Sequence, residues 1–109
     1  MSYLINLTPH ELRIHYSDKV LVLPPSGEVA RVGTVRTSTF SMAEGIPLSF
    51  YKYTEITGLP DPDGRTTYVV SGMVESAAGP GRLDVVSPGD LIRNEMGKPI
   101  GCEGLKKSL

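Results

Sequence analysis

Residues 66–79, TTYVVSGMVESAAG, hold the clearest structural signal in the chain. The first five residues are β-branched or aromatic, a composition typical of a strand inside a sheet. From Gly72 onward the residue types favour a helix, and Gly79 and Pro80 end it. The stretch therefore predicts a central strand at 66–71, followed by the one short helix of the protein at 72–78.

The segments on either side of this stretch predict further short strands joined by turns. They alternate apolar and polar residues or are rich in β-branched residues. Strands are expected at 3–6, 12–16, 20–23, 34–40, 48–56, 83–86, 91–95 and 98–102. Hairpins are expected at 11–23 and 91–102, and a turn at 87–90. Thr8 and Glu11 have the spacing of a capping box, which predicts one helical turn there.

The length and composition favour a single domain spanning residues 1–109. Twelve glycines and nine prolines suit short strands and turns better than a helical bundle. We expect an α+β fold, a predominantly antiparallel β-sheet with one short helix. A sheet this small has exposed edges, and self-association is a common way to cover them, so a homo-oligomer is expected.

Charge and hydropathy narrow the function classes. Eleven Lys and Arg against twelve Asp and Glu give a net charge of −1, which argues against a protein that coats DNA or RNA. The longest apolar runs have four or five residues, too few to span a bilayer. Residues 1–6 do not have the pattern of a signal peptide, so a cytoplasmic location is expected.

Catalytic and metal-binding patterns are weak. Asp61 and Asp63 resemble the start of a calcium loop, but the later ligands do not follow, so a turn is expected. His10 is interpreted as a hydrogen-bonded turn residue and Cys102 as a buried thiol. No nucleophile elbow, Walker loop or dinucleotide fingerprint occurs. We therefore expect no enzyme, no metal and no cofactor.

Anion recognition has somewhat more support. The arginines stand beside β-branched, Gly or Pro residues rather than in charge runs, and they are Arg31, Arg36, Arg65, Arg82 and Arg93. A guanidinium grips phosphate with two donors and stacks on flat rings. Five tyrosines and two phenylalanines supply aromatic faces. A few arginines, one ring and one aspartate would suit a nucleotide. The bland alternative is that each arginine is a solvated strand position.

Several segments together resemble a family of small phage and prophage proteins. The most specific is Asn6-Leu7-Thr8-Pro9-His10, and the looser ones are 24–32, 58–60, 67–71, 82–89, 93–95 and 100–102. This family is similar to the first type of Thoeris anti-defence protein. The resemblance implies a sponge that binds a cyclic ADP-ribose-type immune signal without cleaving it. It also implies an oligomer with pockets at subunit interfaces, and for some members separate sites for cyclic oligonucleotides.

The resemblance also suggests site residues. Arg31 and Arg93 would contact phosphate, and Asp84 would recognise the base or ribose. Tyr68 would stack on the adenine. Arg82 completes the set, at a place where the family pattern has an asparagine.

Two other functions remain open at this point. One is a small phage structural or protein-interaction module without a small-molecule ligand. It would show an exposed apolar patch instead of a pocket. The other is a hydrolase of the same signal, with Asp84 or His10 as the base.

Overall fold

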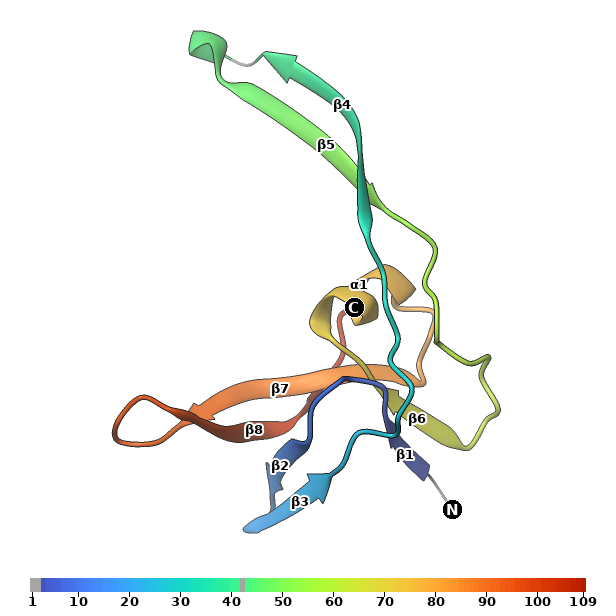
Figure 1. Cartoon of the computed structure of the whole chain (residues 1–109), viewed down its shortest axis with the longest axis vertical. Coiled ribbons are helices and arrows are strands. Elements are labelled where there is room, and N and C mark those ends of the chain that lie inside the picture. The colour runs from blue at the N-terminus through green and yellow to red at the C-terminus, as the bar shows by residue number, and fades with distance from the viewer. Residues whose placement is uncertain (1–2, 42) are drawn as a thin grey trace.

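Strands make up about half of the described chain. The computed structural model in Figure 1 describes residues 3–41 and 43–109. Its elements are β1 (Tyr3–Asn6), β2 (Leu12–Tyr16), β3 (Lys19–Leu23), β4 (Thr34–Ser41), η1 (Ala43–Gly45), β5 (Pro47–Tyr53), β6 (Thr66–Val69), α1 (Gly72–Ala78), β7 (Val85–Arg93) and β8 (Pro99–Lys106). The expectation of a small domain with mostly strands and one short α-helix is confirmed. The described helices include none that is long and apolar enough to cross a membrane.

The main sheet is mixed rather than predominantly antiparallel. Its strand order is β1-β6-β7-β8-β2-β3. The hairpins β2–β3 and β7–β8 are antiparallel, as expected, but β1–β6, β6–β7 and β2–β8 are parallel. The reason is visible at β6, where α1 carries the chain back so that β7 runs in the same direction. Pairing between strands far apart in the sequence accounts for the other parallel neighbours.

The core lies where β6, β7 and α1 meet. Its fully buried side chains include Val70, Val74 and Val85, and Leu7 and Tyr68 join the same cluster. The predicted strand at 66–71 is thus an interior strand, although it stands second from one edge of the sheet. Helix α1 begins as expected, because the Ser71 hydroxyl accepts a hydrogen bond from the Val74 N–H at 3.3 Å.

The predicted turn at 87–90 is wrong, because β7 runs through it. Of the residues in β7, only Val85 and Val86 pair with β6. Beyond them this side of β7 is an open edge, where a proline such as Pro88 is tolerated. The next residue, Gly89, lies against β8. A Cβ there would stand 2.0 Å from the Glu103 carbonyl oxygen. Pro88 therefore lies at an open strand edge and Gly89 allows a close approach of β8, and neither residue forms a turn.

The predicted helical turn at Thr8 is also wrong. The Thr8 hydroxyl donates to the Asn6 Oδ1 at 2.6 Å, and the Thr8 backbone N–H donates to the same oxygen at 2.9 Å. The Asn6 amide donates to the carbonyls of His10 and Leu23. Asn6 and Thr8 therefore fold a non-helical loop, and His10 takes part in it through its carbonyl, in line with its interpretation as a turn residue.

The C-terminal tail, for which the sequence suggests no partner, is fastened to α1. Glu75 is 3% exposed, and its carboxylate accepts hydrogen bonds from the backbone N–H and the hydroxyl of Ser108. Lys107 donates to the Gly79 carbonyl at 3.2 Å and lies 3.8 Å from the Glu75 carboxylate. These contacts outweigh the burial that would raise the Glu75 pKa, and they hold it below its ordinary value.

Strands β4 and β5 form a hairpin that projects from the rest of the molecule, which we call the arm (Thr34–Tyr53, with Met42 outside the described residues). Figure 1 shows the arm extending away from the main sheet. The radius of gyration is 16.9 Å, whereas a compact chain of this length has about 13 Å. Within the described chain, each arm strand packs extensively only against the other. The arm therefore has almost no support from the core.

Candidate functional site

An apolar groove lies over the sheet at β1 and β6. Its volume is about 500 Å³, and its lining is Ile5, Leu7, Ser26, Glu28, Gly58, Leu59, Pro60 and Tyr68. The register pairs Ile5 with Tyr68, which places these two side chains next to each other on one face. Among the described lining residues, Glu28 alone is charged. The groove thus offers apolar walls and one carboxylate, which suit a flat ring and the hydroxyl or amino hydrogens of a ligand.

Two of the residues expected at the site bind each other. Arg82 donates from Nε and Nη2 to the two carboxylate oxygens of Asp84, both at 2.9 Å. Its Nη2 also donates to the Pro60 carbonyl at 2.9 Å. The hydrogen bonds between the Arg82 and Asp84 side chains raise the pKa of Arg82 and lower the pKa of Asp84. The pair ties the loop that carries Pro60 to the start of β7, so it shapes the groove wall.

Asp84 also borders a second, more polar hollow. This hollow holds about 390 Å³ and is lined by Pro62, Gly64, Arg65, Thr66, Thr67, Gly81, Leu83 and Asp84. Because Pro60 lines the groove and Asp84 lines the hollow, the Arg82–Asp84 ion pair connects the walls of both. A ligand in either place would lie close to this pair.

Tyr68 is placed in the groove but offers little ring surface. It is 5% exposed and belongs to the core cluster, and its backbone N–H donates to the Asp84 carbonyl at 2.7 Å. A side chain this buried forms part of the floor. It has too little free ring for the stacking role that the sequence resemblance suggested.

Arg93 lies apart from Tyr68, Arg82 and Asp84, and no hydrogen bond or ion pair in the described chain joins the Arg31 side chain to them. Arg31 pairs through its backbone with Thr57 near the base of the arm, and its side chain is exposed. Arg93 ends β7 and donates to the Gly97 carbonyl at 2.8 Å in the turn before β8. Figure 1 shows this turn on the side of the molecule opposite to β6. The five expected residues therefore do not form one site within a single chain.

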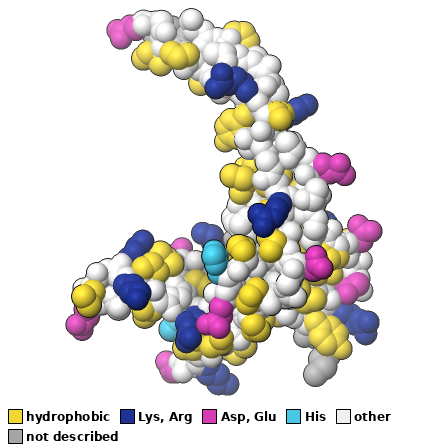
Figure 2. Space-filling model, viewed as in Figure 1, with side chains coloured by type: hydrophobic (Ala, Val, Ile, Leu, Met, Phe, Trp, Pro, Cys, Tyr) yellow, Lys and Arg dark blue, Asp and Glu magenta, His cyan; other side chains and the backbone are white. Residues whose placement is uncertain are grey.

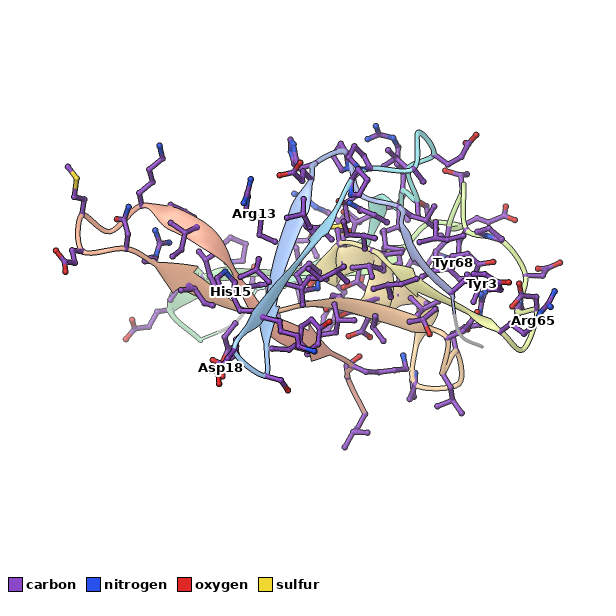
Figure 3. All side chains as sticks on the ribbon, turned by 90° about the horizontal axis from the view of Figure 1, so that it is seen from below. Tyr3, Arg13, His15, Asp18, Arg65 and Tyr68 are labelled. Carbon is purple, nitrogen blue, oxygen red and sulfur yellow. The ribbon has the colours of Figure 1, made fainter. Side chains whose placement is uncertain are left out.

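The ring and the cation best placed beside the groove are Tyr3, to which the sequence did not point, and Arg65, which it offered only as one of five arginines. Tyr3 is half exposed and pairs with Thr66, two residues before the pair that lines the groove, so it continues the same face. The Arg65 guanidinium lies over the Tyr3 ring, 6.0 Å from its centroid. Figure 3 shows Tyr3, Arg65 and Tyr68 on the same side of the molecule. The parallel β1–β6 pairing brings them together, and no local pattern reveals it.

The backbone at Arg65 is held by Asp63. The Asp63 Oδ1 accepts the N–H groups of Arg65 and Thr66 at 2.8 and 2.7 Å, and its Oδ2 accepts the Thr66 hydroxyl at 2.7 Å. These hydrogen bonds, that from the Thr66 hydroxyl first, lower the pKa of Asp63 to about 2. No ion pair involves the Arg65 side chain within residues 3–41 and 43–109, so its guanidinium is available to pair with an anion.

The other side chains considered for catalysis or metal binding lie in surroundings that do not favour those roles. The ion pair holds Asp84 in its charged form and occupies both of its oxygens, which makes it a poor general base. Cys102 is buried in the sheet, as expected, and burial raises the pKa of its thiol, which disfavours the reactive thiolate. In the described part of the chain, no cluster of three His, Cys, Asp or Glu side chains could hold a metal ion.

Comparisons with models of known families, with curated proteins and with solved structures find no match to this chain. The assignment of function therefore rests on the groove and on the resemblance carried by the sequence motifs.

Proposed function

We propose that the protein is a non-enzymatic binder that sequesters a cyclic nucleotide immune signal of the cyclic ADP-ribose type in the cytoplasm of an infected bacterium. The observations that carry the proposal are the apolar groove and, two residues from Ile5 in β1, the Tyr3 ring, over which lies the guanidinium of Arg65 from the lining of the neighbouring hollow. A base or ribose would occupy the groove, and a phosphate would meet the Arg65 guanidinium. The motif resemblance supports the same class of ligand.

The chemistry of the groove suits capture better than cleavage. Glu28 can accept hydroxyl or amino hydrogens, and Arg65 can donate to phosphate, but a general base beside them is not apparent among the described residues. A sponge competes with a receptor, so it needs a dissociation constant of about 1 µM or lower, near −8 kcal/mol. Charge-assisted contacts of roughly 1.5–3 kcal/mol each, together with ring stacking, supply much of this.

A second candidate function is favoured by the arm. It is the protein-interaction module, which needs an exposed apolar surface rather than a ligand. Phe40, Tyr51 and Ile46 are each more than half exposed there. This function predicts no small-molecule affinity.

Thermal melting against a ligand panel separates the two functions. The panel holds cyclic ADP-ribose isomers, cyclic di- and trinucleotides, NAD and ADP-ribose. A ligand at 100 times its dissociation constant adds about 2.7 kcal/mol, a shift on the order of 10 °C for a domain of this size. A shift with a cyclic nucleotide, with the intact compound recovered after boiling, supports the sponge. Cleaved product would indicate a hydrolase, and no shift with any compound would favour the interaction module.

Two arginine variants locate the site. Arg65→Ala is expected to weaken binding of the shifting compound by tenfold or more, because it removes the cation beside the groove. Arg93→Ala is the matched control on the far hairpin and is expected to bind like the wild type. The opposite result would move the site to the β7–β8 turn.

A further inference from the structure

The register of the arm separates its side chains onto two unlike faces, because residues opposite each other in β4 and β5 share a face. One face, which we call the apolar face, holds the pairs Val35–Lys52, Ser38–Phe50 and Phe40–Leu48. The other, which we call the hydroxyl face, holds the pairs Thr34–Tyr53, Arg36–Tyr51, Thr39–Ser49 and Ser41–Pro47. Aliphatic and phenyl groups therefore lie on one side of the arm, and hydroxyl groups dominate the other.

The apolar face is open to solvent in the single chain. Phe40 is 58% exposed and Phe50 46%, although their rings meet edge to face with centroids 5.7 Å apart. Hydrophobic side chains are visible along the length of the arm in Figure 2. In the described chain, β4 and β5 pair only with each other, so each strand also has an outer edge of unpaired backbone groups. A partner of the arm must therefore accept both an apolar face and polar edges.

The arm is the positively charged part of a chain whose net charge is negative. Its charged residues are Arg36, Lys52 and Glu44, which give the arm +1, whereas the whole chain has −1, so the rest of the chain has −2. Arg36 and Lys52 stand in adjacent pairs near the base of the arm. The next four pairs toward the tip hold no charge over about 10 Å. Glu44 lies in η1, at the tip itself.

We propose that the arm binds an anionic lipid bilayer and lies in its interface, with the apolar face toward the acyl chains and the hydroxyl face toward the headgroups. An amphipathic helix at a membrane surface uses the same division of faces. Phe40, Leu48 and Phe50 enter the boundary of the acyl region. Lys52, on the same face, extends its ammonium group up to the lipid phosphates, as long basic side chains do at membrane interfaces.

Two features favour a bilayer over a protein partner. A protein-binding surface has an apolar centre inside a polar rim, whereas the apolar and polar groups of the arm lie on opposite faces of one ribbon. The unpaired strand edges would be costly in hydrocarbon, but water and headgroups satisfy them at the interface. The Glu44 carboxylate stays in the headgroup layer and limits the depth of the tip. This binding does not depend on the proposed nucleotide binding.

Vesicle flotation of the full chain tests the proposal. The wild type is expected to float with vesicles of equimolar phosphatidylcholine and phosphatidylglycerol, and much less with pure phosphatidylcholine. Phe50→Ser removes a ring from the apolar face and is expected to weaken binding about tenfold. Met96→Ser is the matched control, because Met96 is 92% exposed between β7 and β8, and it should bind like the wild type. A wild type that does not float, or equal loss in both variants, would overturn the proposal and leave a protein as the partner of the arm.

Tryptophan fluorescence tests which face meets the lipid. The chain has no tryptophan, so Phe40→Trp and Thr39→Trp each introduce a single indole, on opposite faces of the arm. With the anionic vesicles, the emission of Phe40→Trp is expected to shift to shorter wavelength as the indole leaves water. The emission of Thr39→Trp is expected to shift much less. A shift at Thr39→Trp as large as that at Phe40→Trp would contradict the proposed orientation.

Charge variants test the recognition of an anionic surface. A basic residue near such a surface strengthens binding about fivefold, so Lys52→Glu is expected to weaken flotation with the anionic vesicles by about tenfold or more. Glu44→Gln removes a repelled carboxylate and is expected to strengthen it. If both variants bind like the wild type, the arm does not recognise anionic lipid and the proposal is wrong. Circular dichroism confirms the fold of each variant. Nucleotide affinity plays no part in these readouts, so failure here leaves the groove untouched.

Discussion

Polar side chains that look like ligand-binding groups in the sequence are in several places bound to their own chain. Arg82 and Asp84 are the clearest case, because each satisfies the other and Arg82 also holds the Pro60 carbonyl. Asn6 is another, since it makes four hydrogen bonds while only 1% exposed. The resemblance motif that begins at Asn6 therefore includes residues that the fold itself requires. Arg65, which the sequence offers only as one of five arginines, forms no ion pair within residues 3–41 and 43–109.

The Asn6 network predicts a large loss of stability in Asn6→Ala. The variant removes the acceptor of the Thr8 N–H and hydroxyl and the donor to the His10 and Leu23 carbonyls. It should lower the free energy of unfolding by about 3 kcal/mol. Urea denaturation followed by circular dichroism measures this. Ser26→Ala is the control, because its side-chain bonds are exposed, and it should stay within about 0.5 kcal/mol of the wild type. If Asn6→Ala also stays within about 0.5 kcal/mol of the wild type, the network contributes little to stability.

Asp63 predicts part of the response to acid. Its pKa falls from the ordinary value of 3.8 to about 2 in the folded protein, so the unfolded chain binds more protons between these values. The stability it contributes is present above its unfolded pKa and is lost as the pH falls through about 2. The melting temperature of Asp63→Asn, which keeps an acceptor oxygen but no charge, should fall less between pH 5 and about pH 2. Parallel curves for the two proteins would contradict this.

At the scale of elements, the sequence predicted the structures that depend on neighbouring residues but not the pairing of distant strands. The hairpin β2–β3, the strand β4 and the helix α1 follow from residues close in sequence, and each was predicted within one or two residues. The parallel pairs β1–β6 and β2–β8 join strands separated by about half the chain or more, so no turn in the sequence indicates that they pair. The same is true of the tail, whose partner Glu75 lies on a helix formed 33 residues earlier.

The contact between α1 and the tail predicts a measurable effect of Ser108→Ala. The variant removes the hydroxyl that donates to the buried Glu75 carboxylate, and hydrogen bonds to charged groups contribute roughly 1.5–3 kcal/mol. We expect a loss of about 2 kcal/mol in urea denaturation. Ser76→Ala, an exposed position on the same helix, is the control and should change little. If both variants behave alike, the tail does not stabilise α1.

The whole molecule consists of a sheet with a core and an arm that has none. The ends of the arm are close together, since the Thr54 N–H donates to the Gly33 carbonyl at 2.8 Å and the Gly33 N–H donates to the Thr54 hydroxyl at 2.8 Å. The arm can therefore be removed without moving the chain that leads into it and out of it.

Replacing residues 34–53 by an Asn-Gly turn should leave the rest of the protein folded. Because the arm packs against little else in the described chain, we expect the melting temperature of the isolated monomer to change by less than about 5 °C, equivalent to roughly 1 kcal/mol. Differential scanning calorimetry at low protein concentration measures it, with the wild type at the same concentration as the reference. An unfolded product would show that the arm supports the core.

The sequence by itself determined most of the strands, the hairpins β2–β3 and β7–β8 and the single α-helix, because these depend on alternation, β-branched content and turn residues within about ten positions. It did not determine that β7 is one continuous strand through Pro88 and Gly89. It also determined that residues 34–40 and 48–53 are extended, from their β-branched and aromatic content. Only the tertiary structure decided that β1 lies parallel to β6, which makes the groove and puts Tyr3 and Arg65 beside it. It likewise decided that Arg82 binds Asp84 and that the exposed apolar side chains of the arm pack against little else in the described chain. The reason is that these features depend on contacts between distant segments, whose closure no short stretch of residues encodes.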